Sequence, residues 1–190
     1  MIKLKYGNTN TFFVNGLLID TDYAGTLPAF FKAIKSGGIV LSDILFVFAT
    51  HYHPDHVGLI SELTELGVRL LLMEHQMPFV HFSDEIFGRD LRLVYKPIDE
   101  SGAVVIRCEE SREFLRELGI DGEIVPTVSH SGDGAALILD SGECFVGDLE
   151  PLEYLGAYKN NHALKKDWEL LMSHCPKVIY YGHANEKILK

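Results

Sequence analysis

The chain has 190 residues, a net charge of −10 with histidine neutral, 47% hydrophobic residues and 23% charged residues. This length and composition predict a single globular domain over residues 1–190, with a sizeable core. The acidic balance excludes a general basic footprint for nucleic acid, and no apolar run is long enough to cross a bilayer. We therefore expect a small-molecule partner rather than a nucleic acid or a membrane.

The three cysteines, Cys108, Cys144 and Cys175, are widely spaced and form no Cys-x-x-Cys pair. An odd, sparse set favours reduced thiols over a disulfide framework. The N-terminus lacks the basic, apolar and small-residue order of a signal peptide. These features predict a cytoplasmic protein, and no feature of the sequence indicates the oligomeric state.

The first half of the chain alternates strand patterns with helical patterns. Apolar spacing and turn residues predict, in chain order, a strand at 2–6, strands at 11–14 and 17–20, a helix at 27–34, a strand at 44–49, a helix at 57–66 and a strand at 68–73. Asn15-Gly16 is the dipeptide most typical of a tight hairpin, so it predicts that the second and third strands pair directly.

The second half repeats this alternation after a poorly patterned stretch. Residues 74–82 have a helical pattern that Pro78 interrupts, and residues 83–96 indicate a loop or a short helical insertion over the site. Beyond them we predict strands at 104–106 and 123–125 around a helix at 111–118, a hairpin of 135–139 and 144–146, a helix at 163–173 and a strand at 178–181. Strands in both halves, with helices between or after them, favour an α/β sandwich of two mainly antiparallel sheets with outer helices.

Metal-binding side chains are concentrated directly after the predicted strand at 44–49. Residues 50–56 read Thr-His-Tyr-His-Pro-Asp-His, and imidazole and carboxylate are ligands of zinc and related divalent ions. His51 and His53 are two apart in extended backbone, so they project to the same side and can share one ion. Asp55 and His56 follow the turn at Pro54 and can serve a second ion. One short loop therefore offers ligands to two metals.

Three later loops add further ligands, each where a predicted strand ends. His130, Asp148 and His183 lie in these loops, and Gly147 and Gly182 precede the last two of them. Strand ends on one edge of a sandwich can converge, which is how a site is built from distant sequence. We expect these three side chains to complete the metal site.

The residues of this loop, continued as far as Gly58, match the HxHxDH signature of the metallo-β-lactamase superfamily, which the chain resembles from residue 1 to about 190. His130, Asp148 and His183 fall in the expected order. The turn at 20–22, Asp-Thr-Asp, resembles the acidic turn after the family's first hairpin. The resemblance implies an α/β (α+β) fold, the four-layer αββα sandwich of two mixed, mainly antiparallel sheets with outer helices.

The resemblance also implies which residues hold two divalent ions. One ion would be held by His51, His53 and His130, the other by Asp55, His56 and His183, and Asp148 would bridge both. Asp20 is expected behind the ligands, where it could orient a ligand histidine through its other ring nitrogen. The nitrogen and oxygen donors suit zinc first, with manganese or iron as alternatives, because no thiolate selects among them.

As a function, the resemblance implies a metal-dependent hydrolase in which a bridging hydroxide between the two ions attacks the substrate. Asp55 and Asp148 are the expected catalytic residues. No appended helical domain and no basic arm is evident, which favours a small ester, thioester or lactone as substrate. The alternatives are a phosphodiesterase or nuclease with the same two ions, a mononuclear-iron thiol dioxygenase, and a non-enzymatic binding module.

Candidate substrate contacts come from the motif and from the segment before the last predicted helix. Tyr52 and His162 are the main candidates. The same segment also contains Tyr158, Asn160 and Asn161. Phe79, Phe82 and Phe87 could line a substrate pocket, although packing in the core or in a lid is the default for them.

Overall fold

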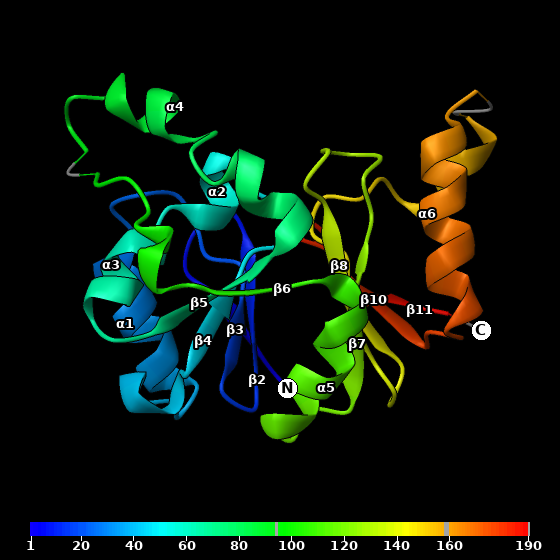
Figure 1. The fold of residues 1–190 in the computed structure, drawn as a ribbon, viewed down its shortest axis with the longest axis horizontal. Coiled ribbons are helices and arrows are strands. Elements are labelled where there is room, and N and C mark those ends of the chain that lie inside the picture. The colour runs from blue at the N-terminus through cyan, green and yellow to red at the C-terminus, as the bar shows by residue number, and fades with distance from the viewer. Residues whose placement is uncertain (94, 158–159, 190) are drawn as a thin grey trace.

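Two β-sheets face each other at the centre of the computed structural model, which describes residues 1–93, 95–157 and 160–189 (Figure 1). The first sheet has the strand order β1 (Ile2–Lys5), β2 (Asn10–Val14), β3 (Leu17–Ile19), β4 (Phe46–Phe48), β5 (Arg69–Met73) and β6 (Val104–Ile106). The second has the order β11 (Lys187–Ile188), β10 (Val178–Tyr180), β9 (Glu143–Phe145), β8 (Ala135–Leu139) and β7 (Gly122–Pro126).

Helices cover the outer faces of both sheets. α1 (Leu27–Ser36) and α3 (Ile60–Glu65) lie outside the first sheet, α6 (His162–Ser173) lies outside the second, and α5 (Ser111–Glu117) packs on β7. The remaining helices are α2 (Pro54–Val57), α4 (Asp84–Gly88) and the 3₁₀ turns η1 (Leu41–Asp43), η2 (Glu74–Phe79), η3 (Glu100–Gly102), η4 (Cys108–Glu110) and η5 (Leu152–Gly156). The order helix, sheet, sheet, helix is the predicted αββα sandwich.

The two sheets differ in how their strands pair. β1, β2 and β3 are antiparallel, and the Asn15-Gly16 turn joins the last two as predicted, with both residues at positive φ. From β3 to β6 all neighbours are parallel, because the chain crosses over the outer face through helices between successive strands. The second sheet is antiparallel except between β9 and β10, which α6 connects. Antiparallel pairing therefore predominates only in the second sheet.

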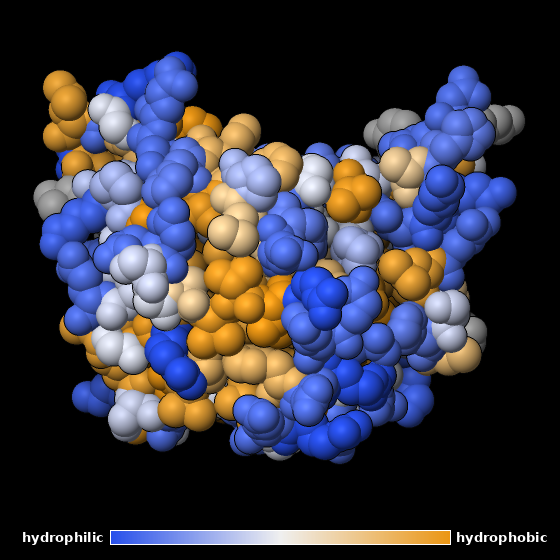
Figure 2. All heavy atoms as spheres, in the orientation of Figure 1, coloured by the Kyte–Doolittle hydropathy of each residue, from blue (hydrophilic) through white to orange (hydrophobic). Residues whose placement is uncertain are grey.

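This mixed pairing places the loops with predicted ligands at one edge of the sandwich. β4, β7, β9 and β10 run in directions that bring their C-terminal ends to that edge, and the loops after them contain the predicted ligands. Ligands commonly bind outside the carboxyl ends of strands in such sheets. Figure 2 shows this edge hollowed between two raised parts, the α4 segment and the beginning of α6.

Alternating side chains of the strands build separate layers of core. Leu17, Ile19 and Phe46 face the second sheet, whereas Leu18 and Val47 face α1 and α3. The outer core of the second sheet is centred on Trp168 of α6, which is buried against strand residues. The central strands β3 and β4 thus bury both faces, which explains why their sequences are continuously apolar, whereas the edge strand β1 alternates apolar residues with exposed lysines.

Several elements differ in detail from the sequence prediction. The helix expected at 57–66 is divided into α2 and α3, and Gly58 lies between them where a Cβ atom would collide with the backbone of Tyr23 and Ala24. Residues 74–79 form a 3₁₀ turn, in keeping with Pro78, and β11 was not predicted. None of the helices in the described residues combines the length and the apolar character that a membrane span requires.

Candidate metal centre

The metal-binding loop changes from extended to helical backbone at Pro54. His53 is extended, with φ −72° and ψ 152°, and Pro54 begins α2, a position where its missing N–H costs nothing. His51 and His53 therefore leave the extended part of the loop, whereas Asp55 and His56 project from the first turn of α2. This local geometry separates the two pairs of side chains, as the sequence predicts.

The structure brings the seven predicted ligands together as overlapping groups. His51, His53 and His130 form one group, Asp55, His56 and His183 form another, and within each group the ligand atoms lie within 4.8 Å of one another. His130 Nε2 lies 3.3 Å from His53 Nδ1, and His183 Nε2 lies 2.9 Å from Asp55 Oδ2. Each group has the donors and the spacing that a single divalent ion requires.

Asp148 lies between the two groups. Its carboxylate forms a third group with His51 and His56, one histidine from each set. Asp148 Oδ1 lies 3.3 Å from His56 Nε2, and Asp148 Oδ2 lies 3.4 Å from His183 Nε2 and 4.0 Å from His130 Nε2. A carboxylate in this place can contact an ion in either group, and its charge would offset part of the repulsion between two dications.

Buried atoms without hydrogen-bond partners test whether metal ions fit this site. His51 Nε2, His56 Nε2 and Asp148 Oδ1 are all buried and have no partner with hydrogen-bond geometry in the described part of the chain. Leaving such atoms unpaired costs about 1–3 kcal/mol each. All three belong to one of the ligand groups, so a bound cation would satisfy all of them. The donor set therefore fits two divalent ions.

The charges of the site divide its histidines into two kinds. Burial, followed by the nearby His56 and His53 rings, holds the pKa of His51 well below its ordinary value, so this imidazole is neutral. Burial also opposes a charge on His56, but the carboxylates of Asp20 and Asp148 outweigh burial and raise the pKa of His56 to about 10. A metal ion must therefore displace a proton from His56.

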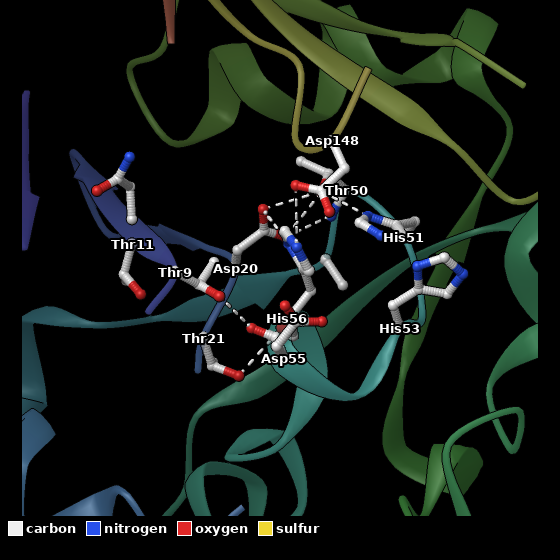
Figure 3. A network of polar contacts seen from close by, with 12 residues as sticks. Thr9, Thr11, Asp20, Thr21, Thr50, His51, His53, Asp55, His56 and Asp148 are labelled. Carbon is white, nitrogen blue, oxygen red and sulfur yellow. Dashed lines mark hydrogen bonds and ion pairs between the residues drawn. The ribbon is translucent and has the colours of Figure 1, made fainter. Parts of the chain in front are cut away.

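Asp20 lies directly behind two of the ligands (Figure 3). Its Oδ2 is 2.9 Å from His56 Nδ1, and it also accepts a hydrogen bond of 2.9 Å from the hydroxyl of Thr50. Thr50 Oγ1 in turn lies 3.2 Å from His51 Nδ1. Asp20 thus orients His51 through Thr50 and His56 directly. Their Nε2 atoms are then free to face bound ions.

Two glycines make room for the ligands. Gly147 has φ +56°, and a Cβ atom there would collide with Thr50. At Gly182, a Cβ atom would lie 2.6 Å from Asp148 Oδ1 and 2.8 Å from His56 Cε1, so any larger residue would obstruct the site. The glycine that precedes Asp148 is thus needed for its backbone conformation, and the one that precedes His183 is needed for a close approach.

The turn before β2 and the first residue of that strand support the candidate ligands Asp55 and His183, a role that the sequence did not indicate. Asn10 donates from its side-chain nitrogen to the carbonyls of Tyr181 and Ala184, both at 2.9 Å, and from its backbone to Gly182 at 2.7 Å. Thr9 Oγ1 donates to the carbonyl of Asp55 at 2.7 Å. Asn10 precedes the strand predicted at 11–14, so no local pattern indicated this role.

Gln76 and Asp133 support the other side of the metal-binding loop, and sequence reasoning missed both. The Gln76 amide donates to the carbonyls of Ala49 and Asp133 at 2.9 and 3.0 Å. Asp133 Oδ2 accepts the backbone N–H of Tyr52 at 2.6 Å. Both side chains are buried. Their partners lie far away in sequence, so no local pattern could have revealed them.

Of the predicted substrate contacts, Tyr52 needs correction, whereas the role of His162 stays a prediction. Tyr52 is 1% exposed and belongs to the core under α1 and α3, because its side chain points to the opposite side of the extended loop from its neighbours His51 and His53. Asn161 caps α6 by accepting from Leu164 N–H, and His162 is exposed at the first residue of that helix. Tyr158 lies outside the described residues.

Phe79, Phe82 and Phe87 have separate places. Phe87 is buried in the core, and Phe79 approaches Gly132 in the loop that contains His130. The Phe82 ring is 52% exposed and lies over the ligand His53, with 5.4 Å between the ring centres and 33° between the ring planes. Phe82 is therefore the aromatic residue of this set that reaches the opening of the site.

An αββα sandwich with two overlapping histidine and aspartate groups at one edge defines a class of metalloproteins with two adjacent ions. A sequence profile of the metallo-beta-lactamase superfamily matches residues 4–183. The chain therefore belongs to the metallo-beta-lactamase superfamily, whose members are generally metal-dependent hydrolases. A search of curated proteins found no match to the sequence.

Solved structures agree with this fold. A metallo-beta-lactamase family protein of Thermus thermophilus is 22% identical, with a TM-score of 0.69, and the match covers 95% of this chain and 69% of that chain. A protein crystallised in a di-iron-bound form is 24% identical, with a TM-score of 0.69 and coverages of 98% and 93%. An archaeal superfamily protein from Sulfolobus tokodaii is 18% identical, with a TM-score of 0.70 and coverages of 98% and 80%.

Proposed function

We propose that the protein is a hydrolase that uses two divalent metal ions to cleave a small ester, thioester or lactone. The observation that carries the proposal is the position of Asp148, whose carboxylate faces both the group of His51 and the group of His56. A single-ion protein has no need for a second complete ligand group around a shared carboxylate. Zinc is the first expected metal, with manganese or iron as alternatives.

Ions bound there would polarise a carbonyl oxygen and make water nucleophilic near neutral pH. The residues of the chain then have separate tasks. Asp148 holds the two ligand groups at a fixed separation. Asp55 is partly exposed, with Oδ2 beside His183, so we assign to Asp55 the transfer of a proton to the leaving group. Asp20 and Thr50 fix the ring orientations of His56 and His51.

The surroundings of the ligands favour an uncharged substrate. A cavity beside the ligands His130, Asp148 and His183 has no lysine or arginine among the described residues that line it. A phosphodiester normally requires such cations or additional metal contacts. We therefore place the phosphodiesterase function second. We also propose that the substrate is a small molecule and that the protein acts in the cytoplasm.

Metal content and substrate range together test the proposal. Elemental analysis of the purified protein should give about two zinc, manganese or iron ions per chain, and Asp148→Ala should lower this number. Esters, thioesters, lactones and phosphodiesters should then be assayed in parallel with the metal-loaded protein. We expect turnover of at least one carbonyl substrate, which Asp55→Ala and Asp148→Ala should reduce by orders of magnitude.

Other outcomes would lead to other functions. About one iron per chain, unchanged in Asp148→Ala, would instead support a mononuclear iron dioxygenase, to be tested by oxygen consumption with thiols. Hydrolysis of phosphodiesters alone would favour the nuclease alternative. Activity close to wild type in Asp148→Ala, with metal retained, would refute the role of this carboxylate.

A further inference from the structure

A cavity of about 260 Å³ opens beside His130, Asp148 and His183. Its other walls come from the segment after Asp148 and from the residues that flank His183. We propose that this cavity is the subsite for a short, unbranched apolar group of the substrate, an inference that rests on the proposed function. The substrate's carbonyl would lie at the ligands and its hydrocarbon part against Leu149, Pro151 and Ala184.

The size of the cavity suits a small group. Pockets for drug-sized ligands generally have volumes of about 300–1,000 Å³. At about 260 Å³ this cavity lies just below that range, which suits a short chain better than a large ring system. Because it lies beside candidate ligands from both metal groups, part of a molecule bound at the ions can extend into it.

The walls of the cavity are hydrocarbon. Leu149 is buried beneath it, and Pro151 and Ala184 offer only aliphatic atoms. Tyr181 also lines it but is 6% exposed, and its hydroxyl oxygen is fully buried, so the surface that Tyr181 offers is carbon. Apart from the metal ligands, Glu150 is the one charged residue among the described residues that line the cavity.

The same walls are held in place by hydrogen bonds that do not involve a substrate. Trp168 Nε1 donates to the carbonyl of Glu150 at 2.9 Å, and Gly182 N–H donates to the carbonyl of Gly147 at 2.8 Å. Asn10 donates to the carbonyl of Ala184. The cavity is therefore formed in advance, and binding an apolar group there requires no ordering of its walls.

Phe82 offers a competing place for an apolar group on the other side of the ligands. Its exposed ring lies over His53, away from the cavity lining. A single flat ring can contact one face of a substrate, whereas the cavity offers apolar surface from both the segment after Asp148 and the residues that flank His183. Contact with both wall segments removes more apolar surface from water, so we assign the chain to the cavity.

Binding of straight-chain carboxylates tests this assignment separately from catalysis. Acetate through octanoate should be titrated calorimetrically into the metal-loaded wild-type protein, because their carboxylates can anchor at the ions. Each methylene that enters the cavity should increase affinity about four-fold, up to a length at which the increase stops. Ala184→Leu adds three carbons to an exposed position on the wall, so it should shorten this limit by about two or three methylenes.

Two variants serve as controls. Asn185→Leu places the same side chain one residue further along, at an exposed position that does not line the cavity. It should leave the chain-length series unchanged. Phe82→Ala should also leave the series unchanged. Metal content must be equal in all four proteins, which shows that each variant is folded around its ions.

The outcomes separate the subsite from the proposed function. Affinity that does not depend on chain length, or a series that Phe82→Ala abolishes while Ala184→Leu does not, would overturn the subsite. A length-dependent series that Ala184→Leu shortens, without hydrolysis of any ester, thioester or lactone, would support the subsite and overturn the proposed function. A protein that binds no metal would overturn both.

Discussion

Asp20 Oδ2 lies 2.9 Å from His56 Nδ1, and Oδ1 of the same carboxylate accepts the backbone N–H of Thr50 at 2.6 Å. The bond to Thr50 attaches the end of β3 to the start of the metal-binding loop. Asp20 adopts φ +58°, which is uncommon for a residue with a side chain, and it is 1% exposed. A strained backbone conformation persists only where the surrounding contacts fix it, and such positions cluster at functional sites.

Replacing Asp20 by Asn should therefore weaken metal binding by about 10–100-fold. The amide keeps the size of the side chain but loses the charge that orients His56. Affinity should be measured by competition with a chelator of known strength. Asp43→Asn is the matched control, since that exposed carboxylate accepts the backbone N–H of Val40, just before η1. Equal affinities in Asp20→Asn and wild type would contradict the orienting role.

Gly182→Ala should destabilise the protein by about 1–3 kcal/mol and lower its metal content. The added Cβ atom would lie 2.6 Å from Asp148 Oδ1, so the carboxylate must move away from the histidines. Gly156→Ala is the control, because a Cβ atom at that position meets nothing within 4 Å. Thermal unfolding and elemental analysis would check both variants. A fully loaded Gly182→Ala protein with unchanged unfolding temperature would show that this close approach is unimportant.

Asn10→Ala should remove the ion held by Asp55, His56 and His183 more readily than the other ion. The substitution leaves the carbonyls of Tyr181 and Ala184 without their donor, which costs about 1–3 kcal/mol and loosens the loop that contains His183. We expect metal content to fall from about two ions to about one after dialysis against a weak chelator. Asn185→Ala, at an exposed position of the same loop, should retain both ions. Equal loss of the two ions in Asn10→Ala would contradict a local effect.

Metal binding at pH 8 should release about one proton from His56. The carboxylates of Asp20 and Asp148 raise the pKa of this histidine to about 10, so it is protonated at pH 8 in the metal-free protein. With its ordinary pKa near 6.5, almost no proton would be bound at that pH. Calorimetric titrations in buffers of different ionisation enthalpy measure the number released. A count near zero would show that the two carboxylates do not raise this pKa.

The same shift predicts how the stability of the metal-free protein depends on pH. Because the folded-state pKa of His56 is raised, its contribution to stability is fully present below about pH 6.5 and is lost as the pH rises toward 10. The unfolding temperature of the metal-free protein should therefore fall over that interval. Asp20→Asn should flatten this dependence, since it removes one of the two charges that raise the pKa.

Local sequence determined much of the fold and indicated all seven candidate metal ligands. The Asn15-Gly16 hairpin, the apolar strands and the histidine loop each depend on neighbouring residues, because turn chemistry and side-chain period act over a few positions. The loop itself separates its ligand pairs, since Pro54 ends the extended backbone. Pro78 likewise made a regular helix over residues 74–82 uncertain, and residues 74–79 form a 3₁₀ turn.

Only the tertiary structure decided which distant residues support these ligands. Asn10, Gln76 and Asp133 act through hydrogen bonds to carbonyls and amides far away in sequence, and a buried amide or carboxylate has no periodicity that would show its partner. The parallel pairing of β3 to β6 follows from the crossovers through the helices, which bring separate strand ends to one edge. Tyr52 turned into the core because alternate residues of an extended loop point in opposite directions. The sequence alone thus indicated the candidate metal ligands, and the packing of the two sheets determined what surrounds them.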